Sequence, residues 1–422
     1  MVLNRNLAKV KSRTGSVAQE VHEAVQKILR DVRENGDRAL AHYARQFDGF
    51  TGQIPTVLNE AEIQAAFQAA GEDFLKIAKR AKAQITQFHA NQVEQSWDMG
   101  KAHGVVMGQI VRPLERVAIY VPGGTAAYPS TVLMCAVPAI LAGVENLVIF
   151  TPVKADGRIS PEILAAAALC GIRGIYKVGG AQAIGAAAYG TETIPKVDKI
   201  VGPGNAYVAE AKRLVYGEVD IDMVAGPSEI LIIADEKANP RYIAADLLGQ
   251  AEHDSLARAI LVTTSEKIIA ETELELQRQL ETLSRREIAE KSLSQHGAAI
   301  LAKNLDEAFA IANDLAPEHL EILTENPLDM LPKVKHAGSI FLGEYTPEAL
   351  GDYMSGTNHV LPTAGTARFY SPLSVRDFVK WSSYSYYPRE ALAAYKDDVM
   401  QFARLEGFDA HANSVAVRFE EA

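Results

Sequence analysis

The alternation of short apolar segments with alanine-rich helical stretches restricts the fold of this sequence more than any other feature. Three such segments, NLVIF, GIYKV and DKIV, are each followed by a turn and a helical stretch. A second series begins after residue 228 with EILIIAD and continues through AILVTT, AAILA, LEILT and SIFLG. Strands that alternate with helices form parallel sheets, so the sequence predicts an α/β protein with two Rossmann-like parallel-sheet domains.

The 422 residues exceed what one hydrophobic core usually supports, which also favours two principal domains. We expect one α/β domain at 120–229 and a second, discontinuous α/β domain at 17–119 and 230–373. A short arm is expected at 1–16, and the pattern after about Ser371 predicts a mostly helical C-terminal extension at 374–422.

Four stretches have the pattern of helices. An apolar stripe with helical period covers 17–32, and Asn35-Gly36 ends it in the way a left-handed stop does. Further helices are expected at 60–70 and 73–91. The apolar run 131–144 is too short to cross a bilayer and contains a proline, so we interpret it as a buried core helix.

Composition excludes several classes of function. The net charge of −11 argues against general binding to nucleic acid or to an anionic membrane. No apolar signal-peptide region follows the N-terminus, and two cysteines cannot form a disulfide framework, so we expect a cytoplasmic protein. Cys135 and Cys170 stand among apolar residues and are interpreted as core residues.

Glycine-rich turns follow the apolar segments of the first series. The stretch 104–124 predicts paired strands around Pro113 that lead into a turn at Gly123-Gly124. VPGGT, VGGAQAIG and VGPGNAY each follow a strand and open a helix, where free N–H groups and the helix dipole can receive a phosphate. None has the dinucleotide-binding spacing, and tight turns use glycine whether or not anything binds. Three such turns at adjacent sheet positions nevertheless favour a nucleotide site.

Polar groups that packing does not explain lie in the second series. In LLGQAEHD, Gln250 and His253 are three residues apart, which places both on one face of a helix. A histidine at such a position is also compatible with a structural role. Together with Asp352 and His411 these residues would form an N/O ligand set suited to zinc or a similar ion, although spacing alone does not join the four positions.

A carboxylate and an imidazole are adjacent in APEHLEI, at the start of an expected strand. Adjacent residues of a strand point to opposite faces, so if both act they belong to the turn after Pro317. Surface charge is the simpler interpretation of Glu318 alone. Together, Glu318 and His319 also suit proton transfer at neutral pH.

These segments carry a resemblance to a known family. VGGAQAIGAAAYGTETIPKVDKIVGPGN, DMVAGPSEILIIAD, DLLGQAEHD, APEHLEI, LGDYMSGTNHVLPT and EGFDAHANSVAVR resemble, in order, the signature segments of histidinol dehydrogenases. The similarity covers essentially the whole chain. It implies oxidation of L-histidinol to L-histidine through an aldehyde by two NAD molecules, in a homodimer with one Zn²⁺ per subunit.

The resemblance also implies a role for each matching residue. It assigns NAD binding to 120–229, the metal and catalysis to 17–119 and 230–373, and dimerisation to 374–422, with the C-terminal segment reaching the partner's active site. By similarity the acid/base pair is Glu318 and His319. The zinc ligands are Gln250, His253, Asp352 and His411; the further substrate contacts are Ser228, His359 and Glu406; the NAD contacts are Tyr120, Gln182 and Asn205.

Residue chemistry agrees with this assignment. His319 can take the hydroxyl proton as hydride leaves. The two cysteines lie in apolar helices without a neighbouring base, so water, activated by Glu318, is the expected nucleophile for the aldehyde. One alternative is a dehydrogenase of another polar alcohol on the same scaffold. The other is a non-catalytic nucleotide- or metal-binding protein, which the presence of Glu318, His319 and four candidate ligands argues against.

Overall fold

A computed structural model describes residues 3–11, 19–123 and 127–420. The chain forms two compact units, one of Met1–Val93 and Leu114–Phe378 and a smaller one of Glu94–Pro113 and Val379–Ala422. Gly124, residue 17 of the expected helical stripe and residues 12–16 of the expected arm lie outside the described residues.

The first sheet of the larger unit has six strands in the order β1-β6-β5-β4-β7-β8. All neighbours are parallel except β1, which runs antiparallel to β6 at one edge. NLVIF, GIYKV and DKIV supply β5, β6 and β7, as predicted. The strands are β1 (Pro55–Val57), β4 (Arg116–Tyr120), β5 (Asn146–Phe150), β6 (Gly174–Tyr176), β7 (Lys199–Val201) and β8 (Asp220–Ile221).

Helices cover both faces of this sheet because its strands alternate apolar side chains toward each side. Ala118, Tyr120 and Ile200 pack with α2, α7 and α8, whereas Val117, Ile119 and Val201 pack with α3 to α6. The helices are α2 (Gln19–Tyr43), η1 (Ala44–Asp48), α3 (Glu60–Ala70), α4 (Glu72–His89), η2 (Ala90–Gln92), α5 (Pro129–Ala142), α6 (Pro161–Leu169), α7 (Gly180–Tyr189) and α8 (Ala206–Val215).

Two predictions about this region are refined. Gly36 breaks the helical geometry of α2 with φ of 49°, as expected of a stop, but helical residues resume after it. The expected domain division placed residues 17–119 in the domain of the five-stranded sheet. In the structure, α2, α3, α4 and β4 instead belong to the domain of the six-stranded sheet. The reason is that both faces of this sheet require helical cover, which the helices between its own strands supply only in part.

The second sheet is entirely parallel, in the order β11-β10-β9-β12-β13. Its strands are the five predicted apolar segments, and the central three are buried on both faces. The strands are β9 (Glu229–Ala234), β10 (Arg258–Thr263), β11 (Ala298–Leu301), β12 (His319–Leu323) and β13 (Ser339–Leu342).

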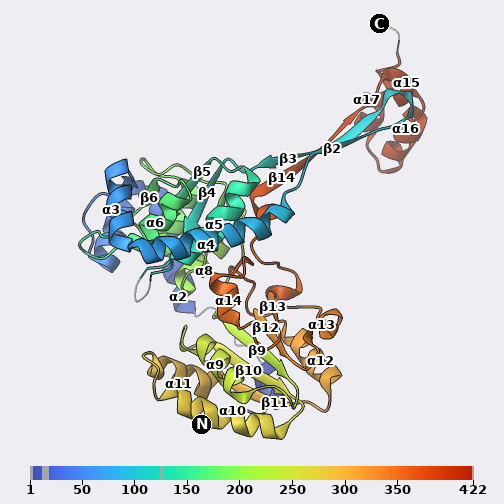
Figure 1. Cartoon of the computed structure of the whole chain (residues 1–422). Helices are drawn as coiled ribbons and strands as arrows, with labels where there is room; N and C mark the ends of the chain where they lie inside the picture. Colours follow the sequence, from blue (N-terminus) through green and yellow to red (C-terminus); the bar gives the residue numbers. More distant parts are fainter. Residues whose placement is uncertain (1–2, 12–18, 124–126, 421–422) are drawn as a thin grey trace. The chain divides into compact units, whose positions relative to one another are not determined.

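Helices α9, α10 and α11 pack on one face of this sheet, and α12 with the N-terminal α1 packs on the other (Figure 1). The helices are α1 (Leu7–Lys11), α9 (Pro240–Ala251), α10 (Glu266–Leu280), α11 (Arg286–His296), α12 (Leu305–Leu315), α13 (Pro327–Met330), η4 (Leu331–Lys333), α14 (Glu348–Tyr353), η5 (Thr366–Arg368) and η6 (Val375–Phe378). The chain therefore has the predicted α/β class with two Rossmann-like domains.

The smaller unit contains an antiparallel sheet in the order β14-β3-β2. The expectation that 104–124 forms strands paired with each other is wrong, because β3 pairs with β2 and β14 while β4 joins the six-stranded sheet. In the C-terminal extension, β14 interrupts the predicted helical pattern between η6 and α15. The elements are β2 (Trp97–Gly100), η3 (Ala102–Gly104), β3 (Val106–Pro113), β14 (Val379–Tyr386), α15 (Arg389–Ala393), α16 (Lys396–Leu405) and α17 (Asp409–Ala416).

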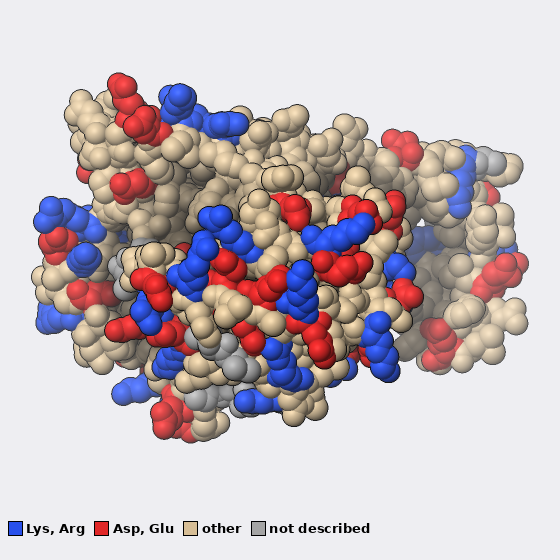
Figure 2. Space-filling view, turned by 60° about the horizontal axis from the view of Figure 1, so that its bottom comes forward, with Lys and Arg blue, Asp and Glu red and all other residues tan. Residues whose placement is uncertain are grey.

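The positions of the cysteines and of the charged side chains agree with the expectations drawn from composition. Cys135 and Cys170 are both free and buried, as predicted. None of the helices in the described ranges is long and apolar enough to cross a membrane. On the face that Figure 2 shows, basic side chains stand among acidic ones, so that face presents no continuous basic surface to a polyanion.

Candidate functional site

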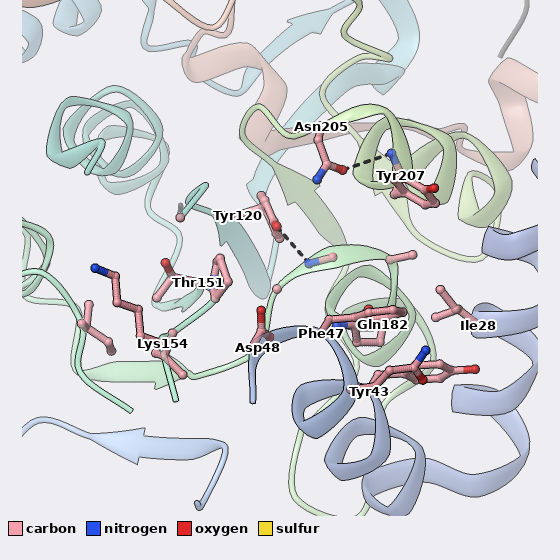
Figure 3. Close-up of a pocket in the computed structure, with 18 of the residues that line it drawn as sticks. Ile28, Tyr43, Phe47, Asp48, Tyr120, Thr151, Lys154, Gln182, Asn205 and Tyr207 are labelled. Carbon is pink, nitrogen blue, oxygen red and sulfur yellow. Dashed lines mark hydrogen bonds between the residues drawn. The ribbon is translucent and has the colours of Figure 1, made fainter. Parts of the chain in front are cut away.

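A cavity of about 1440 Å³ lies at the carboxyl edge of the six-stranded sheet. It is lined by the ends of β4 and β5, the start of α7, the start of α8, and parts of α2 and η1 (Figure 3). Ligands of open α/β sheets bind at this edge, beside the point where strand order reverses. Here that point lies between β4 and its neighbours β5 and β7.

All three predicted NAD contacts line this cavity. The Tyr120 hydroxyl accepts a hydrogen bond from Gly180 N at 3.0 Å, at the first turn of α7. Asn205 caps α8, with its Oδ1 accepting from the backbone amides of the second and third residues beyond it, each at 3.1 Å. Gln182 is buried, and its Oε1 has no hydrogen-bond partner within the described part of the chain. An unsatisfied buried amide oxygen that lines a cavity indicates a ligand partner.

The turn after β7 is held on both sides by a buried ion pair. Lys212 Nζ donates to Gly202 O at 3.0 Å, and Asp222 Oδ2 accepts from Gly202 N at 2.8 Å. Lys212 and Asp222 also pair directly with each other. Gly202 has φ of 108°, and a Cβ there would lie 2.2 Å from Tyr120 O, so the close approach of these two segments requires glycine.

A second polar cluster lies at the amino ends of the strands of the five-stranded sheet. Glu318 directly precedes β12, His319 is its first residue, and both are buried. Glu318 Oε2 accepts from Glu229 N, at the start of β9, at 2.8 Å. Both residues therefore lie at the buried amino end of β12 and not in an exposed turn. Because Glu318 is buried, it is not explained as a surface charge.

Hydrogen bonds fix the tautomer of His319. Its Nδ1 lies 3.0 Å from Glu229 O and 3.0 Å from Gln250 Oε1. A backbone carbonyl only accepts, so Nδ1 carries the proton and donates it. In the neutral ring Nε2 is then the free basic nitrogen, and it lies 3.6 Å from Glu348 Oε1.

A candidate metal centre lies beside this imidazole. Ligand atoms of His253, Glu348 and Asp352 all lie within 4.8 Å of one another. His253 and Asp352 were predicted as ligands. Gln250 is fully buried on α9, but His253 lies just past the end of that helix, in the turn that leads to β10. Gln250 and His253 therefore do not share a helix face as predicted, because Gln250 lies at the end of α9 and His253 lies in the turn that follows it.

Glu348 was missed by sequence reasoning. It stands four residues before Asp352 on α14, a spacing that places two carboxylates on one helix face and could have identified it. Its side chain is buried, and its Oε1 has no hydrogen-bond partner among the residues described. His359, a predicted substrate contact, joins the group because its Nδ1 lies 3.1 Å from Asp352 O and 3.7 Å from Asp352 Oδ1.

Burial dominates the protonation of this cluster. It lowers the pKa of His319 to about 4 and lowers that of His359, so both imidazoles are neutral at pH 7. It raises the pKa of Glu318 well above its usual value and that of Glu348 to about 8, in both cases with further contributions from neighbouring carboxylates. Neutral imidazoles beside carboxyl groups are suited to accept and hand on protons.

The remaining predicted residues are divided between the two units. Ser228 directly precedes β9, and its carbonyl accepts from Arg258 N at 2.9 Å. Glu406 and His411 are exposed residues of the smaller unit, after α16 and on α17 respectively. Residue type and the family resemblance therefore identified the imidazole and carboxyl groups of the larger unit, with Glu348 as the omission.

Two Rossmann-like domains, one with a nucleotide-sized cavity and the other with buried imidazoles and carboxyl groups, define an oxidoreductase. The family model of histidinol dehydrogenase matches residues 11–419, and the chain belongs to that family. It is 60% identical over 98% of its length to the histidinol dehydrogenase of Lactococcus lactis, of which it covers 96%. It is 56% identical over 97% of its length to that of Clostridium acetobutylicum, of which it covers 95%.

A solved structure agrees with these relatives. The crystal structure of histidinol dehydrogenase from Elizabethkingia anophelis superposes with a TM-score of 0.93 at 39% identity. The match covers 99% of this chain and 98% of that one. The similarity therefore extends through both sheets and the C-terminal segment.

Proposed function

We propose that this protein oxidises L-histidinol through L-histidinal to L-histidine, the last two steps of histidine biosynthesis, with two molecules of NAD. Family membership over the whole chain supports the reaction. The single observation that carries the chemistry is the fixed tautomer of His319, whose free Nε2 faces a buried acidic cluster.

The first oxidation requires a base for the hydroxyl proton. Nε2 of the neutral His319 takes this proton while the carbon-bound hydrogen leaves as hydride to the nicotinamide ring. The hydrogen bonds from Nδ1 to Glu229 O and Gln250 Oε1 hold the ring in place and stabilise the imidazolium that forms.

The second oxidation requires water. The carboxylate form of Glu318 accepts a proton from a water molecule as the water oxygen adds to the aldehyde carbon. The imidazolium of His319 returns its proton to the carbonyl oxygen, which gives the hydrate and leaves His319 neutral again. His319 then takes a hydroxyl proton of the hydrate as the second hydride leaves, and the carboxylic acid results. The buried Cys135 and Cys170 cannot serve as nucleophiles, because burial raises the pKa of Cys170 to about 11 and that of Cys135 still further.

The residues present fit a divalent ion such as Zn²⁺. The imidazole of His253 and the carboxyl groups of Glu348 and Asp352 are close enough to share one ion, and Glu348 Oε1 is buried without a hydrogen-bond partner among the described residues. When bound, the ion would hold the substrate's imidazole and amino group and so orient its hydroxyl. Gln250, His253 and Asp352 would hold it together with His411 from the partner subunit.

A chelator experiment tests the metal assignment. Metal removal should abolish turnover while the circular dichroism spectrum persists, since the large core does not depend on these ligands. Elemental analysis should show one zinc per subunit, and His253→Ala should lose that zinc. Full activity in a preparation shown to be metal-free would contradict the proposal.

The cavity residues support the choice of NAD. Tyr120, Gln182 and Asn205 would contact the cofactor, with the unpaired Gln182 oxygen gaining its missing hydrogen bond. The cytoplasm suits both the cofactor and two free cysteines.

We further propose a homodimer with shared active sites. The smaller unit exposes many large apolar side chains, which suits a surface covered by a second copy. Among them are Trp381, Tyr386, Phe402, Leu405 and Phe408.

A mixing experiment tests this arrangement. His253→Ala and His411→Ala should each be inactive, yet mixed dimers would contain one site with both residues intact. Random exchange makes about half of the dimers mixed, so roughly a quarter of normal activity should return. No recovery after subunit exchange confirmed by mass would place the whole site in one chain.

The central experiment is NADH formation from L-histidinol, with histidine as product and two NADH per substrate. The second candidate, oxidation of another polar alcohol on the same scaffold, is favoured only if a different alcohol gives the higher kcat/KM. A chain that releases no NADH with any of these alcohols would contradict both.

A further inference from the structure

We propose that Asp48 makes the cavity select a nicotinamide dinucleotide whose adenosine ribose has a free 2′-hydroxyl and reject one with a 2′-phosphate. This inference rests on the proposed NAD-dependent function and adds the residue that decides which of the two nicotinamide cofactors is used.

Three aspartates line the cavity, and two of them already have partners. Asp31 accepts a hydrogen bond from Asn35 Nδ2 at 2.8 Å. Asp156 forms an ion pair with Arg158 at 2.7 Å. Asp48 makes neither a hydrogen bond nor an ion pair with the described residues, although it is half-buried. The structure thus leaves one acceptor-only group available inside the cavity.

Packing does not explain this carboxylate. Asp48 is the last residue of η1, and Figure 3 shows its carboxylate pointing toward Tyr120, with the ring of Phe47 beside it. Burial raises the pKa of Asp48, so its charged form is less favourable here than in water. A partly desolvated carboxylate without a partner costs free energy of folding, which is offset when a ligand supplies hydrogen-bond donors.

The topology of the sheet indicates which ligand groups donate hydrogen bonds to Asp48. In doubly wound sheets the carboxylate that binds the adenosine ribose commonly follows the second strand, which here is β5. That strand is followed by Thr151 and Pro152 instead of an acid. Asp48 comes from a different segment but lines the same cavity as both residues. It can therefore supply the acceptor that the end of β5 lacks.

A ribose with two free hydroxyls and a 2′-phosphorylated ribose differ sharply beside Asp48. The 2′- and 3′-hydroxyls can both donate to one carboxylate. A 2′-phosphate cannot donate there and places like charge against like charge in a partly desolvated site. Of the basic residues that line the cavity, Lys27, Lys154 and Arg158, the last is already paired with Asp156.

The test compares Asp48→Asn with Asp31→Asn, a matched control that removes the same charge from the same cavity. In Asp48→Asn the preference for NAD over NADP, as a ratio of kcat/KM values, should fall about tenfold or more, since a charged hydrogen bond and a repulsion are lost together. Asp31→Asn should keep the wild-type ratio. An unchanged ratio in Asp48→Asn, or an equal fall in both variants, would overturn the inference.

Binding of NAD with a 2′-deoxyadenosine moiety identifies the hydroxyl. The wild-type protein should bind this analogue about tenfold more weakly than NAD, and Asp48→Asn should bind the two equally. Asp48→Ser serves if the asparagine variant does not fold, and the wild-type comparison needs no variant. If the wild type binds both dinucleotides alike, Asp48 does not contact that hydroxyl. Failure of the wild type to reduce NAD at all would instead contradict the proposed function.

Discussion

The two α/β domains of the larger unit use opposite edges of their sheets. In the six-stranded domain the cavity lies at the carboxyl ends of the strands and is shaped by glycine turns. In the five-stranded domain Glu318, His319 and Glu229 stand at the amino ends of β12 and β9. The rule that locates ligands in open α/β sheets therefore describes the first domain and not the second.

This difference shows that the two sheet edges offer different chemical groups to a ligand. A carboxyl edge offers helix N-termini and backbone amides, which suit an anionic cofactor. At the amino edge of the second sheet, the end of α9 and the start of β12 instead bring Gln250 and His319 together. We infer that the first domain contributes binding through its backbone and the second contributes proton transfer through side chains.

Replacing His319 should have the largest effect. His319→Ala should lower kcat by about 10²- to 10⁴-fold for both oxidations, because the base of both steps is lost. NAD affinity, measured by titration, should remain normal, since His319 does not line the cavity. The exposed His103→Asn serves as control. A loss of NAD affinity in His319→Ala as large as its loss of kcat would mean that cofactor binding and proton transfer are not separated between the two domains.

Glu318→Gln separates the two oxidations. With histidinal as substrate, kcat should fall about 10²-fold, whereas the alcohol step needs no activated water and should fall much less. Single-turnover kinetics with each substrate measures both steps. The surface variant Glu325→Gln should be neutral, and normal oxidation of histidinal by Glu318→Gln would remove that residue from the mechanism.

Gly202→Ala should disturb the first domain without touching the second. The new Cβ would clash with Tyr120 O, so the KM for NAD should rise and stability should fall by roughly 2–5 kcal/mol. Gly217 has a similar φ of 103° but nothing within 4 Å of its would-be Cβ. Gly217→Ala therefore measures the backbone strain alone, about 1 kcal/mol, and equal urea midpoints for the two variants would refute the steric explanation.

The pH dependence of stability should report on the second domain. Burial raises the pKa of Glu348 to about 8 from a usual 4.5. The stability of the metal-free protein should therefore fall as pH rises from about 4.5 to 8, by at most about 1.4 kcal/mol per pH unit from this group. Glu348→Gln should flatten that slope, whereas exposed Glu344→Gln should leave it unchanged in urea titrations.

The central strands of both sheets were predictable because they are covered on both faces and have continuous apolar runs, whereas the short edge strands β1 and β8 were not predicted. β14 was not, since nearly every residue of VKWSSYSY is exposed and the segment lacks an apolar period. The packing of α2 and α4 on the six-stranded sheet was also missed, because helical periodicity shows that a face is buried but not against which partner.

For the candidate site, too, the sequence identified residues but not their contacts. Gln250, His319 and Asp352 were identified from residue type and resemblance, but only the structure shows that Gln250 contacts His319. Glu348 stands in an ordinary helical segment, PEALGDY, where a carboxylate usually faces solvent. Its burial depends on a contact with β12, where Glu321 Oε1 accepts from its backbone amide at 2.8 Å. No local sequence signal encodes that contact.

The ion pair of Lys212 and Asp222 bears on the rate of cofactor exchange. The proposed reaction consumes two NAD molecules per histidinol, so the cavity would release NADH and refill between the two oxidations. A turn clamped through both its carbonyl and its amide keeps its shape when the cavity is empty. Each refilling then needs no reordering of the chain, and the second NAD can enter as fast as diffusion and release of the first allow.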